Sequence, residues 1–249
     1  MSKIKKSFQK IFAIFTLVIS FALCLSLADL FSSLITVGTF NNEVSATKNT
    51  AYSAFAISLY NSSLKSSASE FAISVQKNGG AGYVWEEGGT HYVIASVYLE
   101  KNDAELVKEN IKSDSVTPEV LKLDFPEIQL ENSYDSNQIV LVNSLLDACK
   151  SAYQKLYDVS ISLDTGLITE TEAKLEIGAE ASNKSKLLSD FAALFPSNLS
   201  NDLLLLKINC ADIVQLLEEL VHYVPSNLQT LSSKIKYNYT KILDLNRRL

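Results

Sequence analysis

The stretch that decides the fold is Ala54-Phe55-Ala56-Ile57-Ser58-Leu59-Tyr60, because a diverged second copy follows at Tyr92-Val93-Ile94-Ala95-Ser96-Val97-Tyr98. Each copy alternates as a strand does. Each is followed by apolar residues at helical spacing, over 68–75 after the first copy and over 104–111 after the second. A strand-then-helix unit that occurs twice predicts a compact βαββαβ module and places the chain in the α+β class.

A glycine pair, Gly88-Gly89, joins the two halves of this module. Both glycines accept positive φ angles, so they favour a two-residue hairpin turn between strands over 82–87 and 90–98. A further strand over 120–125 completes the sheet. The predicted βαββαβ domain therefore spans residues 53–126.

The pattern changes to helices after residue 131. Apolar residues there recur every three or four positions. Turn-forming segments at 164–166, 196–198 and 225–227 divide the region into about four helices. We therefore predict an antiparallel helical bundle over residues 132–249.

Residues 1–40 carry the pattern of a cytoplasmic tip and a transmembrane anchor. Four lysines precede an uncharged run over 11–28, which as a helix rises about 27 Å, close to the ~30 Å hydrocarbon core. Lysines favour the cytoplasmic side. We predict a single-pass cell-membrane protein with a cytoplasmic N-terminus, a tether over 41–52 and an extracytoplasmic bulk. A signal peptide cleaved after Ala28 is the alternative.

The net charge and the absence of certain motifs exclude several classes of function. A net charge of −6 argues against a nucleic-acid partner, which requires clustered Lys and Arg. The sequence has no phosphate-binding loop, no Cys-x-x-Cys pair and no nucleophile elbow. We therefore expect a protein that is not an enzyme and that holds neither a cofactor nor a metal ion.

Two cysteines lie outside the predicted anchor. Cys149 and Cys210 fall on the apolar stripes of two predicted helices. In an oxidising exterior they form one candidate disulfide. Two small buried hydrophobic residues are an equally good interpretation.

The hairpin register assigns the side chains to the two faces of the sheet. A two-residue turn places Trp85 opposite Tyr92. The aliphatic face is the predicted core beneath the two helices and carries Phe55, Ile57, Leu59, Val84, Val93, Ala95 and Val97. The aromatic face carries Ser58, Tyr60, Tyr83, Trp85, Tyr92, Ile94, Ser96 and Tyr98. Rings with a polar edge suit contact with sugars when such a face is open. The alternative is that the helical bundle packs on it.

Residues 53–126 resemble a SPOR domain, the peptidoglycan-binding module of bacterial envelope proteins. The matching positions are Ser58-Leu59-Tyr60 and Ser96-Val97-Tyr98, the helix residues Ala68 and Ala104, and Gly79-Gly80-Ala81-Gly82-Tyr83-Val84. Both signature glycines of the family are serines here, and Ala56-Ile57 replaces the family's Val-Gln pair. The resemblance implies binding of glycan strands that lack stem peptides, in cell division or sporulation. The implied glycan-binding residues are Ser58, Tyr60, Tyr83, Trp85, Tyr92, Ser96 and Tyr98.

Two hypotheses follow. The first is a non-enzymatic, membrane-anchored envelope protein that binds peptidoglycan through the exposed sheet face, while its bundle contacts other envelope or division proteins. The second is an extracytoplasmic protein-interaction scaffold whose sheet face packs on the bundle or on a partner protein. The solvent exposure of Tyr60, Trp85, Tyr92 and Tyr98 distinguishes the two.

Overall fold

The computed structural model describes residues 47–249 except 50, 112–115, 131–133 and 196–198. The described residues belong to one compact unit over 46–249. The predicted anchor at 1–40 and the first part of the tether lie outside the described residues. Within the described ranges, no helix is both long enough and apolar enough to cross a membrane.

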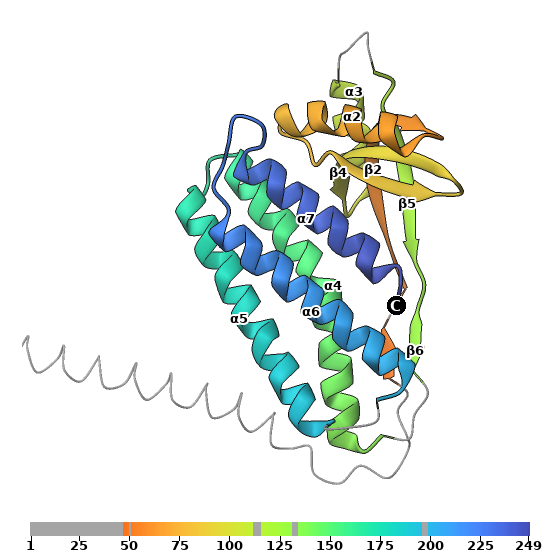
Figure 1. The fold of residues 1–249 in the computed structure, drawn as a ribbon, viewed down its shortest axis with the longest axis vertical. Helices are drawn as coiled ribbons and strands as arrows, with labels where there is room; N and C mark the ends of the chain where they lie inside the picture. The colour runs from red at the N-terminus through yellow and green to blue at the C-terminus, as the bar shows by residue number, and fades with distance from the viewer. Residues whose placement is uncertain (1–46, 50, 112–115, 131–133, 196–198) are drawn as a thin grey trace, which may run out of the picture. The chain divides into compact units, whose positions relative to one another are not determined.

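A four-stranded antiparallel sheet forms the first half of the unit (Figure 1). Its strand order is β3-β4-β2-β5. The elements in chain order are β2 (Tyr52–Ser62), α2 (Lys65–Lys77), β3 (Tyr83–Glu87), β4 (Thr90–Tyr98), α3 (Lys101–Asn110) and β5 (Glu119–Phe125). The predicted βαββαβ module is therefore confirmed. Within the segment predicted as a tether, β1 (Thr47–Asn49) pairs with β6 (Ile128–Leu130).

The hairpin between β3 and β4 has the predicted register. Gly88 and Gly89 adopt φ angles of 59° and 79°, which only glycine reaches without strain. Trp85 pairs with Tyr92, and Val84 pairs with Val93. The two-residue glycine turn thus fixes which side chains of β3 and β4 share a face.

Two irregularities in the pairing of β2 with β4 correct part of the predicted face assignment. The register shifts between Ile57 and Ser58 and again between Ser58 and Tyr60. A shift of one residue moves the following side chains to the opposite face. The prediction that Tyr60 lies on the aromatic face is wrong, because its ring stacks on Phe71 of α2. The prediction that Val97 lies on the aliphatic face, beneath α2 and α3, is also wrong. Val97 packs instead in the cluster that the sheet shares with the four C-terminal helices.

Four helices follow the sheet and run side by side (Figure 1). They are α4 (Ser136–Asp164), α5 (Glu170–Leu194), α6 (Asn201–His222) and α7 (Leu231–Asn246). Side chains cap their first turns: Asp135 and Thr169 each form a reciprocal capping box, and Ser200 and Thr230 accept from backbone amides. The prediction of about four helices is confirmed.

The described core consists of two clusters, one on each side of the sheet. The smaller cluster joins Val93 to Ala68, Ala72 and Val75 of α2. The larger cluster is shared by the sheet and the helical region, and it includes Trp85, Ile94 and Phe125 from the sheet together with Leu145 and Tyr239 from the helices. The sheet is therefore packed on both faces.

Candidate functional site

Trp85 is the centre of the predicted glycan-binding face, and it is buried. Only 1% of its surface is exposed. The guanidinium carbon of Arg247 lies over the indole, 4.4 Å from the ring centroid. The indole Nε1 donates a hydrogen bond of 3.2 Å to Glu87. Both the π face and the polar edge of the ring are therefore occupied by groups of the protein itself.

Tyr83 joins the same sheet face to α7. Its hydroxyl donates to Oδ2 of Asp244 over 2.8 Å, and its ring meets the edge of Tyr237 at a centroid distance of 5.2 Å. Burial, together with the Asp244 carboxylate, raises the pKa of Tyr83. The hydroxyl therefore remains neutral and serves as a donor. Asp244 also pairs with Arg247, at 2.8 Å between the carboxylate and the guanidinium.

Tyr239 of α7 reaches β4. Its hydroxyl lies 3.2 Å from Oγ of Ser96 and accepts from the backbone N–H of Val97. Tyr98 meets Tyr157 of α4 edge to face, with centroids 6.2 Å apart. Burial raises the pKa of Tyr239, which leaves its hydroxyl un-ionised among these partners. Helices α4 and α7 thus cover the part of the sheet face, at Ser96 and Tyr98, where glycan binding was predicted.

The structure brings most of the predicted site residues together, but beneath the helices. Tyr83, Trp85 and Tyr92 belong to, or pack against, the large shared cluster, and Ser96 and Tyr98 contact α7 and α4. Ser58 is fully buried, and its hydroxyl donates to the Tyr60 carbonyl within the irregular part of β2. Tyr60 is separated from the rest by the sheet.

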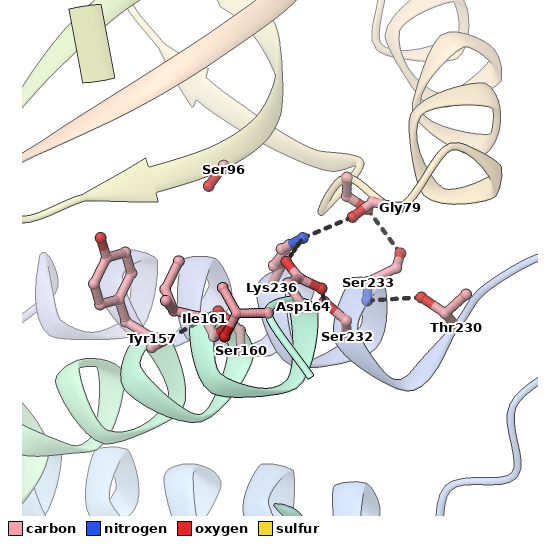
Figure 2. A network of polar contacts seen from close by, with 12 residues as sticks. Gly79, Ser96, Tyr157, Ser160, Ile161, Asp164, Thr230, Ser232, Ser233 and Lys236 are labelled. Atoms are coloured by element: carbon pink, nitrogen blue, oxygen red, sulfur yellow. Dashed lines mark hydrogen bonds and ion pairs between the residues drawn. The ribbon is translucent and has the colours of Figure 1, made fainter. Parts of the chain in front are cut away.

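A polar network, which the sequence did not predict, fixes the loop before β3 to the helices (Figure 2). Lys236 lies 2.6 Å from the carboxylate of Asp164 and donates to the Gly79 carbonyl over 3.1 Å. Ser233 donates to the Gly80 carbonyl over 2.7 Å. These residues come from three distant segments, so no local pattern could have identified them. The network holds the glycine-rich loop against the start of α7.

His91 and Glu86 lie opposite each other in the hairpin between β3 and β4. The two residues pair across β3 and β4, and Nδ1 of His91 lies 3.8 Å from the Glu86 carboxylate. Among the described residues, no three His, Cys, Asp or Glu side chains gather closely enough to hold a metal ion. The hairpin thus holds one histidine beside a solvent-exposed glutamate.

Comparison with known proteins finds no relative. No family model fits the chain, and neither a curated protein nor a solved structure matches it significantly. The arguments about function therefore rest on the packing of the sheet and on the sequence itself.

Proposed function

We propose that this protein is a non-enzymatic, membrane-tethered interaction scaffold outside the cytoplasm, in which the aromatic sheet face serves as an internal dock for the helices. The observation that carries this proposal is the burial of Trp85 beneath Arg247, with Tyr83 bonded to Asp244 beside it. These contacts use the groups that a sugar ligand would need. The membrane tether is an expectation from residues 1–40 of the sequence.

The alternative proposal is peptidoglycan binding through a SPOR-like sheet, and the matching residues in 53–126 favour it. It requires α7 to leave the sheet. Yet Trp85 and Ile94 of the sheet and Tyr239 of α7 lie in the cluster that the sheet shares with the helical region, and each is at most 1% exposed. At about 1.5–3 kcal/mol each, exposing them costs roughly 5–9 kcal/mol. A sugar that binds with micromolar affinity supplies about 8 kcal/mol in total. Opening the face would therefore consume most of that binding energy.

Because the sheet face is covered, partner proteins would bind on helix surfaces away from the sheet. Three exposed apolar side chains lie together on α6, at Leu204, Leu205 and Ile208. Clustered exposed apolar residues are typical of protein interaction sites. This surface leaves the packing of the sheet undisturbed, which supports a scaffold whose sheet and helices act as one body.

Sedimentation of the full chain with peptidoglycan stripped of its stem peptides tests the proposal. We expect the protein to remain in the supernatant at micromolar concentrations. Tyr92 is partly exposed and serves as the probe residue for sugar contact. If the wild-type protein pelleted with the glycan and Tyr92→Ala abolished the pelleting, the SPOR-like proposal would replace the scaffold proposal.

A further inference from the structure

Cys149 of α4 and Cys210 of α6 meet inside the helical region. They are 1% and 0% exposed, and both are free thiols. Each thiol is the hydrogen-bond partner of the other. The two residues are 61 positions apart in the sequence, so their contact depends on the packing of α4 against α6. Both side chains stand in one cluster of the core.

A buried lysine lies beside the thiol pair. Lys184 of α5 is 4% exposed, pairs with Glu180 at 2.7 Å, and donates to Oγ of Ser151 over 3.3 Å. The hydrogen bond from Cys149 lowers the pKa of Cys210, and the positive charge of Lys184 lowers it further. The hydrogen bond to Cys210 and burial raise the pKa of Cys149. In the folded protein, Cys210 is thus the thiol that ionises more readily.

We propose that Cys149 and Cys210 form a disulfide that staples α4 to α6 as the chain folds outside the cytoplasm. The oxidant is a small disulfide or the disulfide form of a thiol oxidoreductase. One of the two cysteines, as the thiolate, attacks one sulfur of the oxidant, and the other half of the oxidant leaves and takes up a proton. The thiolate of the second cysteine then attacks the protein sulfur of the mixed disulfide and releases the remaining half of the oxidant as a thiol. Two S–H bonds are lost, one S–S bond forms, and the oxidant takes up two electrons and two protons.

The burial of both thiols sets the time at which this reaction occurs. A bulky oxidant does not reach sulfur atoms enclosed by α4, α5 and α6. The exchange therefore takes place before these helices close, and the finished disulfide is protected from reductants afterwards.

The staple encloses the whole of α5. This helix buries small or polar side chains along much of its length, including Ala173, Ala181 and Lys184. Only Ile177 and Phe191 among its fully buried residues are large and apolar. A covalent loop that contains the helix with the fewest large buried apolar side chains restrains the unfolded chain where native packing contributes least.

Refolding of the full chain tests the inference. The protein, as wild type and as Cys24→Ser, is unfolded in reductant and refolded in a mixture of oxidised and reduced glutathione. We expect the intact mass to fall by two hydrogen atoms, a peptide that links Cys149 to Cys210, and a Tm about 5 °C or more above that of the reduced protein. Folded, reduced protein in the same buffer should oxidise at least about tenfold more slowly, because the thiols are enclosed.

A matched variant separates this staple from other oxidation products. Cys149→Ala should show neither the mass change nor the rise in Tm. If that variant does not fold, the peptide map of the wild type decides. Free Cys149 and Cys210 after refolding, or a bridge to Cys24, would overturn the inference. Oxidation of the folded protein as fast as that of the refolding chain would overturn the proposed timing. The pair does not involve the sheet, so glycan sedimentation bears only on the scaffold proposal.

Discussion

Arg247, the residue after the last turn of α7, lies over Trp85 in the first strand of the hairpin. Its guanidinium carbon is 4.4 Å from the ring centroid, and its Nη1 donates to the Glu86 carbonyl over 3.1 Å. Arg247 therefore covers the sheet face on which the tryptophan would otherwise be exposed. This contact links two segments that are 162 positions apart in the sequence.

Replacing Arg247 tests how much its contact with Trp85 stabilises the protein. We expect Arg247→Met to lower the free energy of unfolding by about 1–2 kcal/mol, because a cation–π contact with Trp85, a backbone hydrogen bond and an ion pair with Asp244 are lost at a partly exposed site. Arg248→Met is the control. Arg248 also faces Asp244, but it is 64% exposed and 3.6 Å away, so its loss should have little effect. Urea denaturation of both variants measures the difference. Equal losses would show that the contact with Trp85 contributes nothing.

The glycine-rich loop before β3 offers a second matched pair. A Cβ atom at Gly82 would lie 2.4 Å from the Ala72 carbonyl of α2, whereas one at Gly79 would meet nothing within 4 Å. Both glycines have positive φ angles. Gly79→Ala should therefore cost only the backbone strain, about 1–2 kcal/mol. Gly82→Ala should cost at least about 1 kcal/mol more, because the loop must move off α2.

Thermal and chemical unfolding of the two glycine variants provide the measurement. The same stability for Gly82→Ala and Gly79→Ala would mean that the close approach of the loop to α2 does not constrain the fold.

Local sequence patterns predicted the elements of the fold well. The hairpin register followed from Gly88-Gly89, since a two-residue turn leaves one pairing for the strands. The break between α4 and α5 followed from the turn-forming segment 164–166, in which Gly166 adopts a positive φ angle. The irregular pairing around Ser58 has no glycine or proline to mark it. The face of Tyr60 therefore could not be predicted from alternation alone.

Buried tyrosines predict a loss of stability at alkaline pH. Burial raises the pKa of Tyr153 to about 12, and it raises the pKa values of Tyr52, Tyr83 and Tyr239 as well. In the unfolded chain a tyrosine ionises near pH 10. Above that pH the unfolded state releases protons that the folded state still holds, so stability falls as pH rises. The contribution is fully present below about pH 10 and declines from there toward the folded pKa values.

Denaturant titrations between pH 8 and pH 11 measure this decline. Tyr239→Phe should make it shallower, because one group no longer ionises on unfolding, although its lost hydrogen bonds lower stability at every pH. Burial lowers the pKa of Lys234, and this shift makes stability rise with pH. It is one group, whereas the four tyrosines named above make stability fall. Stability that stays constant or rises above pH 10 would contradict the assignment of these tyrosines to the interior.

The orientation predicted from the lysine-rich N-terminus has its own test. Protease added to intact, wall-stripped cells should degrade residues 41–249, because they are expected outside the cytoplasm. A cytoplasmic marker protein should survive the same treatment. Protection of the C-terminal helices while the protease remains active would reverse the predicted topology.

The candidate site was predictable only in part. Alternation placed Tyr83, Trp85 and Tyr92 on one face, and the structure keeps them on one side of the sheet. What covers that face was not predictable, because Asp244 and Arg247 carry no signal that directs them to β3. Aromatic residues on a strand look the same in sequence whether they meet solvent, a sugar or a helix.

The central claim is that the aromatic face of the sheet is part of the protein core, and the free energy of unfolding of Trp85→Ala tests it most directly. Val93→Ala, on the opposite face, is the reference for a core position and should cost about 1–3 kcal/mol. We predict that Trp85→Ala costs roughly 3–5 kcal/mol in the full chain, because it leaves a large cavity beneath α7. A Trp85→Ala protein within about 0.5 kcal/mol of the wild type, as expected for an exposed ring, would contradict the claim.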